Sequence, residues 1–124
     1  LGPEKMPYDV LVVALGSVTR MPDVPGLQEF GFTVKTIGDV IEHRDRGIRL
    51  LELAANVKDP AERRRLLTFV VVGGNYTGVE MAGEYHAFLC EAMERYTELS
   101  PKELRMVLVE RSEHLLGMVK EDLA

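Results

Sequence analysis

The stretch from Thr68 to Glu84, TFVVVGGNYTGVEMAGE, constrains the fold of this chain more than any other part of the sequence. It opens with an uninterrupted run of apolar residues, which is typical of a strand that is buried on both faces. Gly73 and Gly74 end that run, and a segment with apolar residues at helical spacing follows. The order of strand, glycine turn and helix predicts one βα unit of a parallel sheet.

The rest of the chain continues this alternation. Apolar runs predict strands, and apolar residues at helical spacing predict helices. The strands are expected at 8–15, 67–72 and 104–109, and the longer helices at 36–57 and 77–96. The order β-α-β-α-β predicts the α/β class, with a Rossmann-like parallel sheet and flanking helices. Three strands make a thin sheet, whose exposed edges favour pairing in a homodimer.

Local signals mark where the shorter elements begin. Asp59 and Pro60 have the residue types of a helix N-cap and a first helical position. Ser100 and Glu103 have the spacing of a capping box. Gly47 is expected to weaken the first long helix without abolishing it. A short helix is also expected within 112–124.

Composition narrows the classes of function. The chain has 124 residues and a net charge of −5, which gives no electrostatic basis for binding nucleic acid. Cys90 is the single cysteine, so an intrachain disulfide is excluded, and we expect this thiol to be a buried spectator. No apolar run approaches the ~18–20 residues of a membrane-spanning helix. These features favour a cytoplasmic setting.

The glycine turn has most of what a phosphate site needs. Such a site requires a tight turn, close approach of the backbone to the anion, and a helix N-terminus directed at the charge. Gly73 can make the turn, and the absent side chain of Gly78 lets the helix pack against the strand. Asn75 stands at the close-approach position. Asn tolerates left-handed backbone angles better than most residues, so the turn is expected to survive.

An acidic residue completes the pattern of a dinucleotide site. Glu110 ends the last predicted strand, where a carboxylate can accept hydrogen bonds from the adenosine ribose hydroxyls. A carboxylate at this place repels a 2′-phosphate, so NAD(H) is favoured over NADP(H). The neighbouring Arg111 weakens that preference.

These residues resemble those of a known family. LTFVVVGGNYTGVEMAGE closely resembles the NAD-binding segment of the pyridine nucleotide–disulfide oxidoreductase superfamily, whose members are FAD-dependent. YDVLVVALGS resembles the strand and turn by which the chain leaves the FAD domain of these flavoproteins. LSPKELRMVLVERSEHLLGMVKEDLA is most similar to type II NADH dehydrogenases, which are NADH:quinone oxidoreductases.

The resemblance implies roles for individual residues. Glu80 would point toward the nicotinamide and the flavin and is the candidate catalytic group. It is also expected in the first helical turn, where the helix dipole favours any acid. The residues implied in cofactor binding are Gly73, Gly74, Asn75, Tyr76, Thr77, Gly78 and Glu110 for NAD(H), and Ala14, Leu15 and Gly16 on the FAD side.

The resemblance also implies a domain division. Residues 1–35 would be a strand and linker from the FAD-domain side, and residues 36–124 a partial NAD(H)-binding Rossmann domain. The chain is then expected to be a fragment without oxidoreductase activity of its own. Its parent would pass a hydride from NADH to FAD and electrons on to a quinone or a similar acceptor. Contact with a membrane surface would come through regions outside this segment.

Two other classes of function remain open at this point. The parent could be a disulfide or ferredoxin reductase-type flavoprotein that uses NAD(P)H. Alternatively, the chain could be a non-catalytic nucleotide-binding module, or an assembly module held together through its sheet edges. None of the three histidines has the spacing of a metal ligand set, so no metal site is expected.

Overall fold

The computed structural model describes residues 3–117 and residue 119. The chain divides into two units, residues 1–40 and residues 41–124. In the first unit, the short helix α1 (Leu27–Phe30) follows Gly26, whose φ of 82° is in the left-handed region that favours glycine.

Asp39 organises the end of the first unit, where α2 (Ile37–Asn56) begins. Its carboxylate accepts hydrogen bonds from the Thr36 hydroxyl at 2.7 Å, the Lys35 amide at 2.7 Å and the Thr33 hydroxyl at 2.8 Å. These donors, the Thr36 hydroxyl first, hold the pKa of Asp39 well below its ordinary value. The polar cluster fixes the entry into α2.

The strand predicted at residues 8–15 is not formed. The described residues contain one sheet of two strands, and the segment 8–15 pairs with neither of them. Its side chains are exposed, with Val10 at 81% and Val12 at 80% of their full surface. An apolar run becomes a strand only when its backbone groups are paired with those of a neighbouring strand, and segment 8–15 has no such pairing with a described residue.

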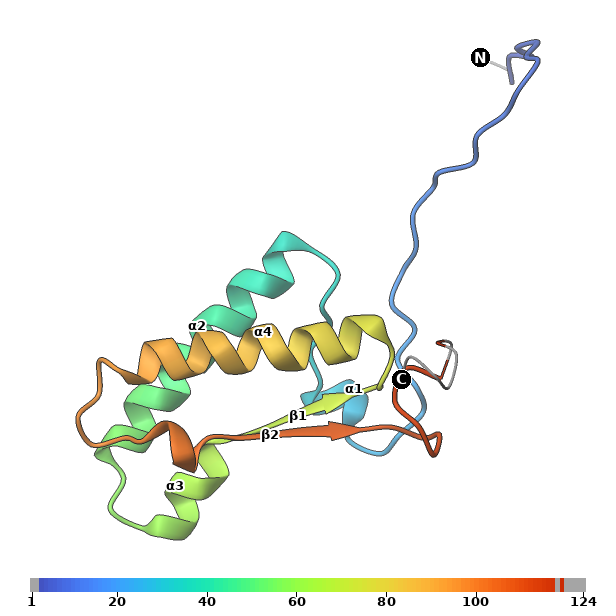
Figure 1. Ribbon diagram of the computed structural model, residues 1–124. Helices are drawn as coiled ribbons and strands as arrows, with labels where there is room; N and C mark the ends of the chain where they lie inside the picture. Colours follow the sequence, from blue (N-terminus) through green and yellow to red (C-terminus); the bar gives the residue numbers. More distant parts are fainter. Residues whose placement is uncertain (1–2, 118, 120–124) are drawn as a thin grey trace. The chain divides into compact units, whose positions relative to one another are not determined.

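The second unit contains the sheet, and it confirms the α/β class. β1 (Thr68–Val72) and β2 (Arg105–Val109) are parallel, with Thr68 beside Arg105 and Val72 beside Val109. The helix α4 (Tyr76–Met93) connects them and lies along the sheet (Figure 1). Phe69 packs toward the core, whereas Val70 on the opposite face is 58% exposed. One face of this sheet is therefore covered and the other is open.

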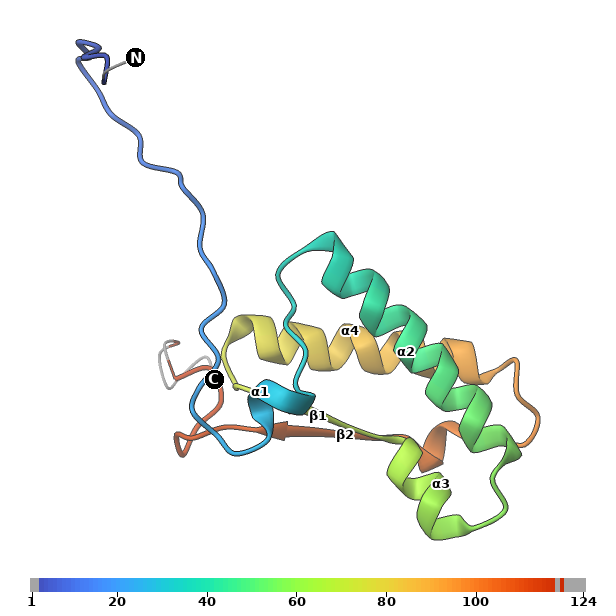
Figure 2. The same cartoon turned by 180° about the vertical axis from the view of Figure 1, so that it is seen from behind.

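Residues 41–56 of α2 pack against α4, which α2 crosses in Figure 2. Gly47 is buried at this crossing, and a Cβ atom there would lie 2.6 Å from the hydroxyl oxygen of Tyr85. That hydroxyl donates a hydrogen bond to the carbonyl of His43 at 2.6 Å. Burial also raises the pKa of Tyr85. The glycine that weakens α2 therefore makes room for a tyrosine that joins the two helices.

The helix starts predicted from the sequence are confirmed. Asp59 caps α3 (Pro60–Leu66) by accepting from the amides of Ala61 and Glu62. Ser100 and Glu103 form a complete capping box around the 3-10 helix η1 (Pro101–Glu103). Such caps stabilise a helix by about 1 kcal/mol each.

The core lies between α2, α4 and the beginnings of the two strands. It contains Leu51, Ala54, Leu66, Leu67, Leu89, Met93, Leu99 and Leu104. Cys90 is half-buried and not fully buried as expected, and its sulfur lies 3.7 Å from the ring of His86. Residues 115–117 form a turn, and most of the predicted terminal helix lies outside the described residues. No helix within 3–117 is long and apolar enough to cross a bilayer.

Two glycines of α4 provide a matched test of its packing. A Cβ atom on Gly78 would collide with the carbonyl oxygen of Gly73, whereas a Cβ atom on Gly83 would meet open space. We expect Gly78→Ala to lower the free energy of unfolding by about 3 kcal/mol. Gly83→Ala should raise it by about 1 kcal/mol because alanine favours the helix. Denaturant unfolding of both variants measures the difference, and equal effects would contradict the packing described.

Candidate nucleotide-binding site

The glycine turn connects the end of β1 to the start of α4. Gly73 has a φ of 110°, which side chains rarely tolerate, and its amide donates to the carbonyl of Val109 at 2.8 Å. The first turn of α4 then returns so closely that Gly78 touches the backbone of Gly73. Both glycines are therefore required by the path of the chain, whether or not a ligand binds.

Asn75 is the N-cap of α4. Its side-chain oxygen accepts a hydrogen bond from the amide of Gly78 at 3.0 Å. Its backbone is extended, with φ at −79° and ψ at −178°, so the left-handed angles considered from the sequence are not adopted. The tight part of the turn is made by Gly73 instead. Asn75 therefore introduces no backbone strain, and it occupies one of the amides at the helix N-terminus.

Glu110 lies at the end of β2, with its carboxylate directed at the glycine turn. Oε2 accepts from the amide of Gly74 at 2.6 Å. Oε1 accepts from the amide of Arg111 at 2.7 Å, and from the amide and hydroxyl of Ser112 at 2.8 and 2.9 Å. The Ser112 amide, followed by the Gly74 amide, lowers the pKa of Glu110 from 4.5 to about 2. The carboxylate is thus firmly ionised at neutral pH.

The segment after β2 encloses Gly74. The amide of Leu116 donates to the Gly74 carbonyl at 2.7 Å, and a Cβ atom on Gly74 would lie 2.7 Å from the side chain of Leu115. Gly74 is buried as a result. Sequence reasoning missed Leu115, Leu116 and Ser112 at this place. For Ser112 a signal was available in the sequence, since it stands two residues after Glu110. Short polar side chains often form hydrogen bonds with groups so close in the chain.

Three consecutive amides remain open at the start of α4. The backbone N–H groups of Asn75, Tyr76 and Thr77 have no acceptor within the part of the chain that the structure describes. All three residues are exposed. The 18-residue helix behind them adds the positive end of its dipole. Together these groups form a place where an anionic oxygen can be bound.

The other predicted site residues belong to other segments of the chain. Glu80 is exposed and belongs to the second turn of α4, so the expectation of an acid in the first turn is wrong. Ala14, Leu15 and Gly16 belong to the extended part of the first unit, where Leu15 is 93% exposed and Gly16 has a φ of 73°. Among residues 3–117, no three His, Cys, Asp or Glu side chains converge as metal ligands would.

Comparison with known proteins decides the family. Residues 2–124 match the sequence profile of the pyridine nucleotide-disulphide oxidoreductases. The chain belongs to this family. It is similar to the external NADH-ubiquinone oxidoreductase 2 of Saccharomyces cerevisiae mitochondria, with 36% identity over 118 residues. It is also similar to a type II NADH:quinone oxidoreductase of Mycobacterium tuberculosis, with 37% identity over 115 residues.

A third relative is the external alternative NAD(P)H-ubiquinone oxidoreductase B4 of Arabidopsis thaliana mitochondria, with 33% identity over 115 residues. The three alignments cover 94%, 89% and 91% of this chain. They cover 22% of the yeast protein, 24% of the mycobacterial protein and 20% of the plant protein. The chain therefore spans about a fifth to a quarter of the length of these relatives.

The lowered pKa of Glu110 predicts a pH dependence of stability. Because the pKa in the folded chain, about 2, is below its ordinary value of 4.5, the ionised carboxylate stabilises the fold above pH 4.5. That contribution disappears as the pH falls from 4.5 through 2. The unfolding free energy of the wild type should fall more steeply over this window than that of Glu110→Gln. Parallel curves from denaturant unfolding would show that the carboxylate does not hold the turn.

Proposed function

We propose that this chain is the NAD(H)-binding segment of an FAD-dependent NADH dehydrogenase. One observation supports the proposal above the others. The free amides of residues 75–77 lie beside the glycine turn, whose Gly74 amide donates a hydrogen bond to Glu110 at the end of the next parallel strand. An anion-binding helix start with a carboxylate at the neighbouring strand end has the donor and acceptor set that a dinucleotide requires.

The pyrophosphate would bind at the start of α4. The amides of Gly74 and Gly78 already donate to Glu110 and Asn75, so they are not available to it. The amides of Asn75, Tyr76 and Thr77 remain as donors. Because Asn75 is exposed and its side chain stands over this helix start, it limits the room beside the phosphate.

Glu110 would bind the adenosine ribose. Oε2 accepts one hydrogen bond, from Gly74, and a carboxylate oxygen can accept a second from a ribose hydroxyl. The negative charge disfavours a 2′-phosphate, so the segment should prefer NAD(H) to NADP(H). Arg111, next in the chain, provides a nearby cation that moderates this preference.

The parent protein would couple this segment to a flavin and a quinone. Hydride transfer from NADH is the chemistry that bound FAD supplies, while the protein orients the groups. Within this proposal residues 1–35 belong to the FAD-domain side, with Ala14, Leu15 and Gly16 near the flavin, and Glu80 helps to position the nicotinamide. The yeast and mycobacterial relatives are named for NADH and for ubiquinone or quinone, which supports these substrates. The chain alone should show no oxidoreductase turnover.

A non-catalytic assembly module that binds no nucleotide is the second candidate. The Asn75–Gly78 and Glu110–Gly74 hydrogen bonds satisfy part of the glycine turn without a ligand. A chain that uses these bonds purely to hold its fold would bind no nucleotide. Binding measurements on matched variants separate the two functions.

NADH titration with a matched pair of acid variants tests the proposal. Glu110→Ala removes the carboxylate at the turn, and Glu113→Ala removes an exposed carboxylate three residues further on. We expect Glu110→Ala to weaken NADH binding about tenfold, because a hydrogen bond to a charged group is worth about 1.5–3 kcal/mol. Glu113→Ala should bind as the wild type does. Absence of NADH binding by the wild-type chain would favour the non-catalytic module.

Asn75→Gly is a further variant in the same titration. It opens the helix start and frees the Gly78 amide, while glycine at an N-cap costs only a few tenths of a kcal/mol of stability. We expect tighter NADH binding, by several-fold. Asn75→Asp keeps an acceptor for Gly78 but adds a charge that repels the pyrophosphate, so it should weaken binding. If Asn75→Gly weakens binding too, the amide side chain itself contacts the nucleotide.

A further inference from the structure

A concave site lies at the end of the sheet opposite to the glycine turn. Its volume is about 620 Å³, within the range of small-ligand sites. It is placed where the strands begin, since Leu67 precedes β1 and Arg105 opens β2, whereas the glycine turn follows the strand ends. The residues that line it are Lys58, Pro60, Arg63, Arg64, Leu67, Lys102, Glu103 and Arg105. We call this concavity the basic site.

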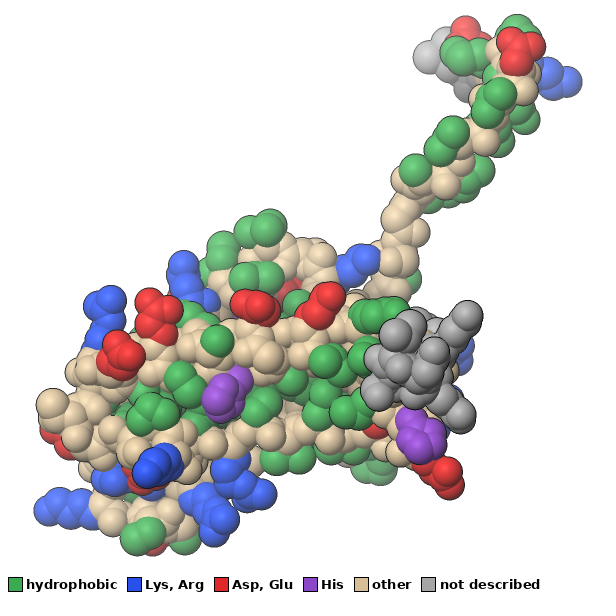
Figure 3. Space-filling model, viewed as in Figure 1, with side chains coloured by type: hydrophobic (Ala, Val, Ile, Leu, Met, Phe, Trp, Pro, Cys, Tyr) green, Lys and Arg blue, Asp and Glu red, His purple; other side chains and the backbone are tan. Residues whose placement is uncertain are grey.

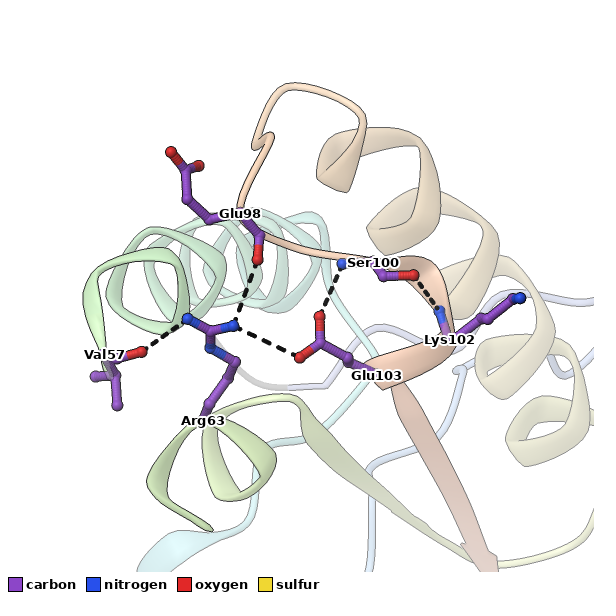
Figure 4. Close-up of polar contacts among 6 residues, drawn as sticks. All are labelled: Val57, Arg63, Glu98, Ser100, Lys102 and Glu103. Carbon is purple, nitrogen blue, oxygen red and sulfur yellow. Dashed lines mark hydrogen bonds and ion pairs between the residues drawn. The ribbon is translucent and has the colours of Figure 1, made fainter. Parts of the chain in front are cut away.

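Arg63 is one of the residues that line the basic site, and Figure 4 shows its polar contacts. Its guanidinium donates to the carbonyl of Val57 at 2.8 Å and to that of Glu98 at 3.4 Å, and it pairs with Glu103 at 3.7 Å. Glu103 also accepts from the amide of Ser100 at 2.9 Å. Arg63 therefore joins the start of α3 to the chain before β2, and it neutralises the single carboxylate of the lining.

The remaining four cations of the lining have no counter-charge among the described residues. The side chains of Lys58, Arg64, Lys102 and Arg105 form no ion pair or hydrogen bond with any described residue. By contrast, the adjacent Arg65 is paired with Glu62 at 2.6 Å. Figure 3 shows Lys and Arg side chains gathered around α3.

This arrangement is unexpected in an acidic chain. The net charge is −5, yet five of the eight residues that line the basic site are cations and one is an acid. Cations gathered in one concavity repel one another. An anion in the concavity would relieve that repulsion. Two of the four cations are arginines, whose planar guanidinium forks bind phosphate oxygens in pairs.

We propose that the basic site binds a phosphate-bearing polyanion. The group that it recognises carries at least two negative charges, as a pyrophosphate or a terminal phosphate ester does. That chemistry is shared by soluble phosphate compounds and by the headgroups of anionic phospholipids. The basic site is separate from the glycine turn, so it does not depend on whether NADH binds there.

Inorganic pyrophosphate is the first probe, titrated into the 124-residue chain at low ionic strength. Backbone amide resonances locate the site, and we expect those of 58–64 and 102–105 to shift. Arg64→Gln/Arg105→Gln should weaken binding by about tenfold or more, since it removes two charged donors. The control Arg44→Gln/Arg49→Gln removes the same charge from the exposed surface of α2 and should bind as the wild type does.

Vesicles identify the source of the phosphate. Phosphatidylcholine vesicles with and without phosphatidic acid are sedimented with the wild type and both double variants. Retention that requires phosphatidic acid, Arg64 and Arg105 assigns the site to a lipid headgroup, and binding of pyrophosphate alone assigns it to a soluble compound. Absence of both kinds of binding overturns the proposal, as does an equal loss in the control variant. NADH affinity should be unchanged in both double variants, which separates this test from that of the glycine turn.

Discussion

The contact between the first turn of α4 and the end of β1 supports the rest of the structure. Gly78 touches the backbone of Gly73, so the helix starts directly above the strand end and not beside it. This placement lets α4 run back along the sheet and return the chain to β2 in parallel. It also sets the open amides of the helix start next to the end of β2. The fold and the candidate site therefore depend on the same close approach.

The two ends of the sheet have opposite chemistry. At the strand ends, an ionised Glu110 provides hydrogen-bond acceptors and the start of α4 provides open amide donors. At the strand beginnings, four cations without an ion pair to any described residue line a concavity. Hydrogen bonds stabilise both ends of the sheet. Arg63 donates to the Val57 carbonyl at the strand beginnings, and the Glu110 carboxylate accepts from the Gly74 amide at the strand ends. A charge change at one end should leave the other undisturbed.

Much of the second unit could be predicted from the sequence because its signals are local. Apolar runs indicated β1 and β2, and helical spacing indicated α2 and α4. Asp59 and the Ser100–Glu103 pair indicated the starts of α3 and η1. The prediction of a strand at 8–15 was wrong. A strand forms only when a neighbouring strand pairs with it, and the apolar character of a segment does not reveal whether such a partner exists.

The site was predictable in outline and not in detail. The glycines and Glu110 could be identified, since turn geometry and strand ends are encoded by residue type. Three contacts could not be predicted, because each depends on the path of the chain after a turn. They are the N-cap formed by Asn75, the hydrogen bonds from Ser112 to Glu110, and the packing of Leu115 against Gly74. The basic site could not be predicted, because its cations come from separate segments of the sequence.

The most direct measurement follows the backbone amide resonances of the chain as NADH is added. We expect the amides of Asn75, Tyr76 and Thr77 to shift most, together with those beside Glu110. Shifts concentrated elsewhere, or none at saturating NADH, would contradict the claim that the start of α4 binds a pyrophosphate.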